Sequence, residues 1–181
     1  MITIIEDGID VAPLLNAVRN RYDLFAMTVA RQSFDQSPHS ETMSIFVRGP
    51  LGWTRDWYQN DIGAMDYPAA QILAEPLRQV VTPILSRLQL AELGRVMIVE
   101  LPPGGRVTTH IDQGEYARHY KRWHLVLSGG KRATLTCGDD VVECWPGRLF
   151  TFNHHKPHSA RNLEDEARIV LIIDGVPRVE A

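Results

Sequence analysis

A histidine and an aspartate stand two residues apart in the segment 101–112, which reads L-P-P-G-G-R-V-T-T-H-I-D. The β-branched residues before His110 favour a strand, and side chains two positions apart in a strand point to the same face. His110 and Asp112 are therefore predicted to project side by side, as two ligands of one metal ion would. A metal face of two histidines and one carboxylate leaves coordination positions open and is typical of non-haem Fe(II) oxygenases.

The third ligand must come from elsewhere, and the segment N-H-H-K-P-H at 153–158 offers His154, His155 and His158. His154 and His155 directly follow a predicted strand, whereas His158 opens the next strand and has the better fixed backbone. We favour His158 as the ligand, with His155 as the second choice. The alternative is that these histidines are surface residues in a polar turn, which leaves the His-x-Asp pair unexplained.

Three further polar side chains interrupt apolar, strand-like sequence. Arg168 enters the run A-R-I-V-L-I-I-D, and a buried guanidinium needs an anion, which it can bind through two parallel hydrogen bonds. Arg122 and His124 alternate with Trp123 and Leu125 in K-R-W-H-L-V-L, so the two polar residues share one face. A dicarboxylate would supply partners for Arg122 and His124. A buried Asp or Glu would also satisfy the pair, and Arg168 could instead reach solvent from a strand end.

These residues fall on a series of short strands joined by tight turns. The strands are expected at 95–101, 105–112, 119–127, 132–137, 141–145, 148–152, 158–162 and 167–174. Closely spaced strands separated by turn sequences such as S-G-G, G-D-D and P-G are typical of a sandwich or jelly roll. We therefore predict a mainly β, cupin-like double-stranded β-helix. One domain is expected over residues 1–181, with the β core at 94–175.

Residues 1–93 are expected to support that core. The apolar spacing predicts helices at 9–18 and 73–88, the second kinked or divided in two by Pro76 and Pro83. Short strands are expected at 2–5, 24–29 and 43–47. The N-terminal helices are predicted to pack on one face of the sheets.

The stretch 48–67 is rich in aromatic, glycine and aspartate residues without a period, so we expect an irregular loop. Long loops at active sites often act as lids. The candidate substrate-binding residues are Arg48, Trp53, Arg55 and Trp57 of this loop, with Tyr116 and His155 from later segments. Aromatic walls with a few cations suit an amino acid or another small carboxylated molecule. The alternative is that Trp53 and Trp57 simply pack the loop onto the barrel.

Composition narrows the class of protein. The chain has 44% hydrophobic residues, 23% charged residues and a net charge of −3, as ordinary globular proteins do. A nucleic-acid surface would need a basic stripe, and a membrane span would need an apolar run of about 20 residues. The N-terminus does not have the pattern of a signal peptide. We therefore expect a cytoplasmic protein in which Cys137 and Cys144 are reduced thiols, not a disulfide.

The chain from about Leu101 to Asp174 resembles the aspartyl/asparaginyl β-hydroxylase family of Fe(II)/2-oxoglutarate-dependent dioxygenases. The opening P-P-G-G-x-x-x-x-H-x-D is similar to that family's first metal motif. The segment R-W-H-L-V-L resembles its R-x-H-L strand, and W-P-G-R-L-F-T-F-N-H-H-K-P-H-S-A is similar to the block that carries the distal iron ligand. Arg168, ten residues after His158, falls where the family places the arginine that holds the far carboxylate of 2-oxoglutarate.

The resemblance implies a double-stranded β-helix that binds Fe(II) through His110, Asp112 and His158. The animal enzymes that name the family lack the carboxylate ligand, whereas Asp112 is present here. The chain is therefore similar to the small bacterial-type members, and the family name does not identify its substrate.

The resemblance also implies that Arg168 binds 2-oxoglutarate, with help from His124 and Arg122. The expected reaction is hydroxylation of an amino acid, a small carboxylated molecule or a short peptide, with release of succinate and CO₂. The alternative function is a metal-binding cupin that serves as a sensor or ligand-binding module. Such a protein would have no use for Arg168 beside an R-x-H strand.

Overall fold

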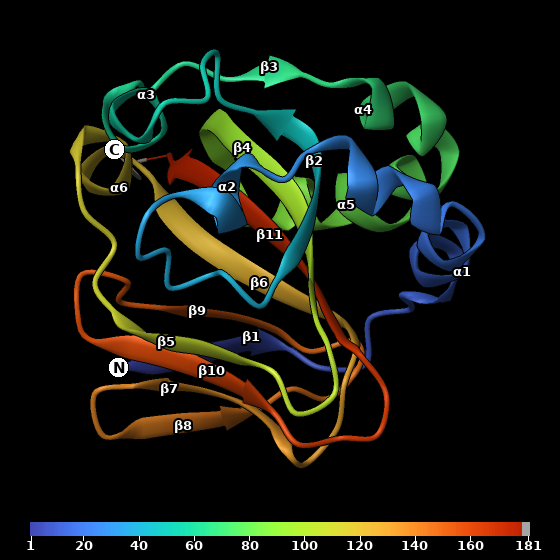
Figure 1. Ribbon diagram of the computed structural model, residues 1–181. Helices are drawn as coiled ribbons and strands as arrows, with labels where there is room; N and C mark the ends of the chain where they lie inside the picture. Colours follow the sequence, from blue (N-terminus) through green and yellow to red (C-terminus); the bar gives the residue numbers. More distant parts are fainter. Residues whose placement is uncertain (179–181) are drawn as a thin grey trace.

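Two antiparallel β-sheets form the body of the molecule (Figure 1). The structure, a computed structural model, describes residues 1–178. In order across the larger, seven-stranded sheet lie β1 (Ile2–Glu6), β9 (Leu149–Phe152), β6 (Lys121–Ser128), β11 (Arg168–Pro177), β4 (Leu90–Leu101), β2 (Met43–Gly49) and β3 (Met65–Asp66). In order across the four-stranded sheet lie β5 (Arg106–His110), β10 (His158–Asn162), β7 (Ala133–Cys137) and β8 (Asp140–Glu143). The mainly β jelly-roll prediction is confirmed.

The described helices are α1 (Ala12–Asn20), the 3₁₀ helix η1 (Tyr22–Met27), α2 (Ala30–Ser33), α3 (Arg55–Asn60), α4 (Pro68–Ile72), α5 (Ala74–Leu88) and α6 (Glu115–His119). Helices α1, η1, α4 and α5 bury apolar residues on the side of the larger sheet that faces away from the smaller one, whereas α2, α3 and α6 contribute residues to a pocket described below. Helices α1 and α5 contact each other and bury their apolar faces on the sheet (Figure 1). This confirms that N-terminal helices pack on one face. None of the described helices is long and apolar enough to cross a membrane.

Strand β6 shows how the sequence alternation builds the site. Trp123, Leu125 and Leu127 belong to the core beneath the helices. The residues between them turn to the interior between the two sheets, where Val126 joins a second apolar core and His124 is 6% exposed. A strand with both faces buried therefore delivers polar side chains into the barrel interior.

The N-terminal part differs from its predicted elements in two places. The expected strand at 24–29 is instead the helix η1, in which the consecutive residues Leu24 and Phe25 are both buried. The expected loop at 48–67 contains α3, whose first turn is capped by the Thr54 side chain accepting a hydrogen bond from the Trp57 N–H. Helix α3 buries none of its residues and has no apolar stripe, so periodicity could not reveal it.

Strands from the N-terminal part complete the larger sheet. β1 pairs with β9, and β2 pairs with β4. The expected boundary at residue 94 falls inside β4. The helix expected at 73–88 is the single helix α5, so the expected division by the prolines is wrong: Pro76 lies in its first turn and Pro83 inside it. The short helix α4 precedes the predicted range.

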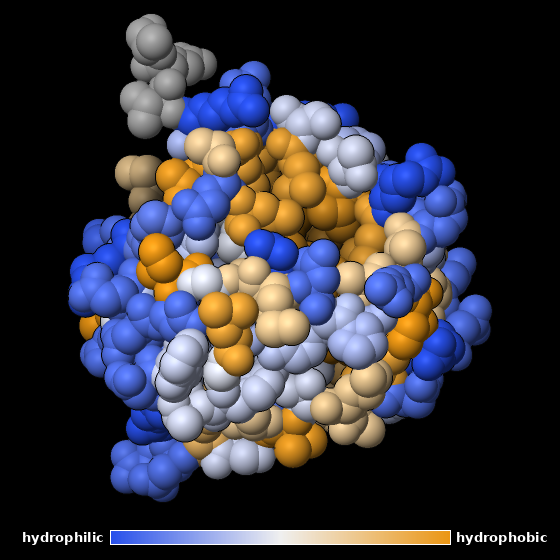
Figure 2. Space-filling view, turned by 90° about the horizontal axis from the view of Figure 1, so that it is seen from above, coloured by the Kyte–Doolittle hydropathy of each residue, from blue (hydrophilic) through white to orange (hydrophobic). Residues whose placement is uncertain are grey.

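The surface seen from above carries an apolar hollow surrounded by hydrophilic side chains (Figure 2). The segment between β2 and α5, at the top of Figure 1, exposes Leu51, Ile62, Met65 and Ile72. In the interior, Cys137 and Cys144 are buried and free, as expected.

Asn162 joins the two strands that carry the metal-ligand candidates. Its fully buried side-chain amide donates to the carbonyl oxygens of Leu101, Pro102 and Glu166, at 3.0, 3.2 and 2.9 Å. Its own carbonyl accepts from the Gly104 N–H at 2.8 Å. The turn that leads into β5 is thereby fastened to the end of β10.

Asn162→Ala should lower the free energy of unfolding by about 1–3 kcal/mol, because it leaves buried carbonyl oxygens without donors. Urea denaturation measures the change. The matched control is Asn16→Ala, an exposed position on α1 that should stay within about 0.5 kcal/mol of the unmodified chain. Equal stability of the two variants would show that the buried amide contributes nothing.

Candidate active site

The predicted metal face assembles at one end of the smaller sheet. His110 ends β5 and His158 begins β10, and the two residues are partners in the antiparallel register. Asp112 lies just beyond the end of β5, where its N–H donates to the carbonyl oxygen of His154 at 3.0 Å. One donor atom from each of His110, Asp112 and His158 lies within 4.8 Å of the others, so the three side chains can hold one metal ion.

The histidine rings are oriented with their Nε2 atoms toward the carboxylate. The Nδ1 atoms lie 2.8 and 2.9 Å from the carbonyl oxygens of Thr108 and Lys156, respectively. A carbonyl only accepts, so each Nδ1 carries a proton, and Nε2 is the ring nitrogen left to bind a metal ion. For His110 and His158, Nε2 lies 3.4 and 3.8 Å from Asp112 Oδ1. Two imidazole nitrogens and one carboxylate oxygen that face one another can bind a cation between them. This set of donor atoms fits Fe(II).

Arg122 binds the carboxylate of Asp112 in the metal face. Its Nη1 donates to Asp112 Oδ2 at 2.7 Å, and its Nε and Nη2 form a bidentate pair with Asp174 at 2.8 and 2.9 Å. Burial alone raises the pKa of Asp112, but Arg122 and the nearby histidines hold that pKa well below its usual range. Asp112 is therefore ionised. Of the two partners left open for Arg122, a buried acid or a cosubstrate, the structure shows buried acids, Asp112 and Asp174.

A small internal cavity beside the metal face contains polar groups without partners. Arg168 is 3% exposed, so its head group does not reach solvent. Its Nε donates to Cys144 Sγ at 3.2 Å, and its Nη2 is buried with no hydrogen-bond partner. Both ring nitrogens of His124 are also buried without partners. Burial, with Arg168 and Arg122 nearby, holds the pKa of His124 well below its usual range, so the ring is neutral.

The rest of the cavity wall is mostly apolar. It includes Val99, Val107, Leu135, Phe152, Val170 and Ile172, and it reaches His110 and His158 of the metal face. Phe152 packs edge-on against His124, with ring centroids 5.2 Å apart. A cation and a neutral donor in apolar surroundings next to a metal face fit a small molecule that carries carboxylates at its ends.

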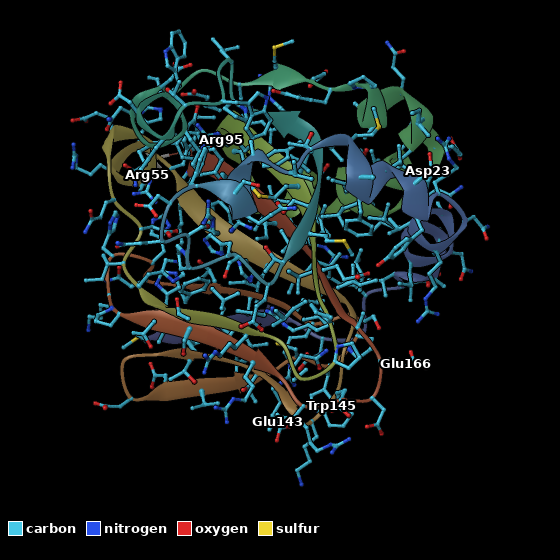
Figure 3. The ribbon with its side chains drawn as sticks, viewed as in Figure 1. Asp23, Arg55, Arg95, Glu143, Trp145 and Glu166 are labelled. Atoms are coloured by element: carbon cyan, nitrogen blue, oxygen red, sulfur yellow. The ribbon has the colours of Figure 1, made fainter. Side chains whose placement is uncertain are left out.

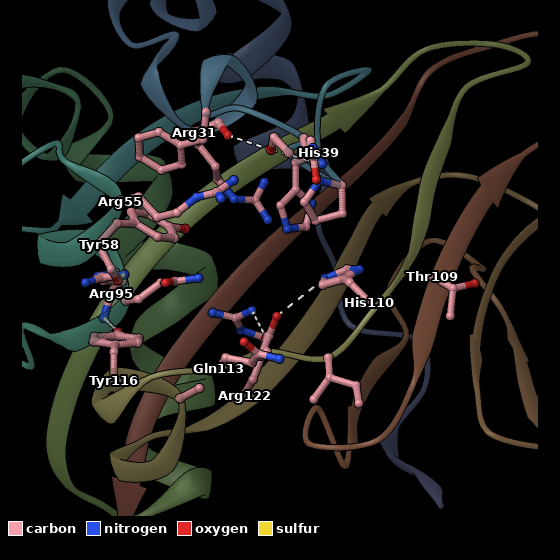
Figure 4. Close-up of a pocket in the computed structure, with 18 of the residues that line it drawn as sticks. Arg31, His39, Arg55, Tyr58, Arg95, Thr109, His110, Gln113, Tyr116 and Arg122 are labelled. Atoms are coloured by element: carbon pink, nitrogen blue, oxygen red, sulfur yellow. Dashed lines mark hydrogen bonds and ion pairs between the residues drawn. The ribbon is translucent and has the colours of Figure 1, made fainter.

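A second, open pocket of about 690 Å³ also reaches His110 and Asp112 (Figure 4). The segment 31–39, helix α3 and helix α6 form its walls. Of the six candidate substrate-binding residues, Arg55 and Tyr116 line this pocket. The Tyr116 hydroxyl accepts from the Arg95 N–H at 2.7 Å and donates to Asp174 at 3.1 Å, which connects the pocket wall to the metal face.

The other four candidates do not line this pocket. Arg48 forms an ion pair with Asp66 at 2.9 Å. Trp53 packs edge-on against Phe46, with ring centroids 4.9 Å apart, so it holds its loop on the sheet as the alternative interpretation proposed. Trp57 is 49% exposed, and His155 is exposed beside His154.

Three pocket residues were missed by sequence reasoning. Arg31 and His39 come from the polar stretch before β2, which has no periodic pattern from which burial could be inferred. Arg95 is 1% exposed and precedes the apolar run V-M-I-V, so the criterion that singled out Arg168 could have found it as well. His39 packs edge-on against His110, with ring centroids 4.8 Å apart, and so lies next to the metal face.

A family model for aspartyl/asparaginyl β-hydroxylases matches residues 36–177, which include both ligand-bearing strands. The chain belongs to this family. The matched region runs from β2 through β11. It therefore includes the metal face and most residues of the small cavity and the open pocket. No curated protein matches the chain.

One solved structure resembles this chain over nearly its whole length. An oxidoreductase of the 2OG-Fe(II) oxygenase family from Burkholderia pseudomallei is similar over 97% of this chain and 96% of its own, with a TM-score of 0.52 at 11% identity. The cupin domain of Cnp3 from Schizosaccharomyces pombe aligns with 48% of this chain and 57% of its own, with a TM-score of 0.39 at 15% identity. A cupin-2 domain from Rhodospirillum rubrum aligns with 48% of this chain and 53% of its own, with a TM-score of 0.36 at 22% identity.

His158→Ala should lower Fe(II) affinity by more than about 100-fold, because it removes one of three ligands, and even the loss of a residue that only orients a ligand costs about 10- to 100-fold. Anaerobic Fe(II) titration followed by calorimetry measures the affinity. The matched control is His155→Ala, which changes an exposed ring outside the cluster and should bind iron normally. Loss of iron by the control with retention by His158→Ala would move the third ligand to His155.

Arg122→Met should lower Fe(II) affinity by about 10- to 100-fold, because Asp112 loses the partner that orients it. The same titration measures this, with the exposed Arg118→Met on α6 as the control. Unchanged iron affinity combined with a raised KM for 2-oxoglutarate would instead assign Arg122 to the cosubstrate.

Proposed function

We propose that the protein is an Fe(II)- and 2-oxoglutarate-dependent dioxygenase that hydroxylates an amino acid, a small carboxylated molecule or a short peptide. The observation that carries the proposal is the buried guanidinium of Arg168, which has no acidic partner among the described residues and an Nη2 without a hydrogen bond, in a cavity that reaches the metal face. A charge in such a place needs an anion, and family membership supports 2-oxoglutarate as that anion. The substrate pocket opens onto the same metal face.

Each turnover would consume one dioxygen and one 2-oxoglutarate. One oxygen atom enters a C–H bond of the substrate, the other enters succinate, and CO₂ is released. Iron, held by His110, Asp112 and His158, would supply the dioxygen activation that no amino-acid side chain provides.

The chain's own residues bind, orient and exclude water. Arg168 would fork onto the far carboxylate of 2-oxoglutarate, and the neutral His124 can donate one N–H into the same cavity. The apolar wall keeps water from that ion pair, which strengthens it. Arg122 keeps Asp112 ionised and aimed at the metal face through Oδ1, since its own contact is to Oδ2.

A metal-binding cupin without oxygenase activity would need the same three ligands. It would gain nothing from a guanidinium that is buried beside them without an acidic partner among the described residues. Burying such a charge without compensation costs several kcal/mol, so its presence favours the enzyme.

The test is succinate release from 2-oxoglutarate by the iron-loaded protein, screened over amino acids, small carboxylates and peptides. Arg168→Met should keep its iron but raise the KM for 2-oxoglutarate by about 10- to 150-fold, since a charge-assisted hydrogen bond is worth about 1.5–3 kcal/mol. The control is Arg161→Met, a change of an exposed arginine on β10. An unchanged KM in Arg168→Met would give Arg168 a structural role and leave the cavity without its proposed ligand.

A further inference from the structure

Arg31 is a buried cation without a counter-ion. It lies on α2 and is 4% exposed, and its Nε and Nη1 atoms are buried with no hydrogen-bond partner. It lines both the small cavity and the open pocket. Among the described residues, no carboxylate forms an ion pair with it. A guanidinium held in this way is prepared for an anion that comes from outside the chain.

The open pocket around Arg31 carries more positive than negative charge. Asp112 is its only acidic lining residue within the described part of the chain, and Arg122 already neutralises that carboxylate. Arg55, on α3 at the exposed edge, donates to the backbone carbonyl of Asp35. Like Arg31, it has no acidic partner among residues 1–178. Figure 4 shows the side chains of Arg31 and Arg55 extending toward the same part of the pocket, beside His39.

Arg95 adds to this charge from the floor of the pocket. It is 1% exposed and donates to the carbonyl oxygens of Tyr58 and Asp61, at 2.8 and 3.2 Å. Its guanidinium lies 3.6 Å from the ring centroid of Tyr116 and 4.5 Å from that of Tyr58. Carbonyls and aromatic faces solvate the cation but leave its charge in place.

Figure 3 shows Arg55 and Arg95 at the end of the molecule that carries α3 and α6. The described lining of the pocket has four arginines and one aspartate, so the pocket is locally positive on a chain whose net charge is −3.

We propose that Arg31, with Arg55 at the entrance and His39 beside the metal face, forms a subsite for a carboxylate of the substrate. The inference rests on the proposed function and narrows its substrate class to anions with a free carboxylate. The planar guanidinium suits a carboxylate, which it can bind through two parallel hydrogen bonds. Arg168 and His124 already provide for a cosubstrate deeper in the cavity, so Arg31 is left for the molecule in the open pocket.

The test compares ligands that differ only in charge. The probes are three acids, N-acetylglycine, N-acetylleucine and N-acetylphenylalanine, and the primary amide of each. Each compound is titrated separately by calorimetry, under nitrogen, into protein that holds Fe(II) and saturating 2-oxoglutarate. Saturation keeps the small cavity closed to the probes, and exclusion of oxygen prevents turnover. At least one acid should bind about 10- to 150-fold more tightly than its amide, the effect expected for one charge-assisted contact.

The variants assign that preference to Arg31. Arg31→Met should abolish the difference between acid and amide while the Kd for 2-oxoglutarate stays within about twofold. Arg31→Lys keeps the charge but loses the planar guanidinium that forms two parallel hydrogen bonds. It should show an intermediate preference for the acid over the amide. The matched control is Arg78→Met, which changes an exposed arginine paired with Glu75 on α5. Thermal melting checks the fold, and Arg31→Met should melt no lower than the unmodified chain, because it removes an uncompensated buried charge.

The subsite is overturned if the unmodified protein binds acid and amide equally well, or binds none of them. It is also overturned if the preference for the acid survives in Arg31→Met. Loss of 2-oxoglutarate binding in Arg31→Met would assign Arg31 to the cosubstrate instead. Succinate release reports the proposed function separately. Repeating the titration on metal-free Arg168→Met protein, whose small cavity no longer offers the Arg168 guanidinium, tests the subsite even if no succinate is formed.

Discussion

The buried contact of Arg122 with Asp112 and Asp174 is the interaction on which the site depends. One guanidinium on β6 joins the adjacent strand β11 to the segment that follows β5, and so connects the larger sheet to the metal face. Without it, two buried carboxylates would share the site with no cation between them. The network continues through the Tyr116 hydroxyl, which bonds Asp174 and the Arg95 backbone. The ligand geometry and the pocket wall therefore rest on the same set of polar contacts.

Much of the β core could be predicted because local pattern and tertiary environment agree there. The strands there have alternating or continuous apolar residues and are separated by Pro-Gly and Gly-Gly turns. This pattern predicts a sandwich or jelly roll. The pairing of His110 with His158 followed from their places at the ends of two strands. The partner of Arg122 could not be chosen in the same way. The sequence allowed either a buried acid or a cosubstrate as that partner. The choice depended on Asp174, which lies 52 residues further along the chain and is brought opposite Arg122 by the pairing of β11 with β6.

The N-terminal part was harder because its residues acquire their roles through contacts that no local pattern encodes. Leu24 and Phe25 read equally well as strand or helix over so short a stretch, and α3 has no buried face. Arg31 stands in a sequence that looks like a polar loop, and only the packing of α2 against the barrel makes it a buried charge. Burial is a property of the whole fold, so a single arginine in a short segment carries no signal of it.

The division between strands and connecting segments has an evolutionary consequence. The iron-ligand candidates and Arg168 stand on or directly beside strands whose backbone hydrogen bonds fix their positions, whereas much of the pocket wall comes from segments before and after β2. Surface connections tolerate insertions and exchanges at small thermodynamic cost. Descendants of one ancestral chain could therefore acquire new substrates by rewriting residues 30–40 and 50–60, while the inherited catalytic strands stayed unchanged.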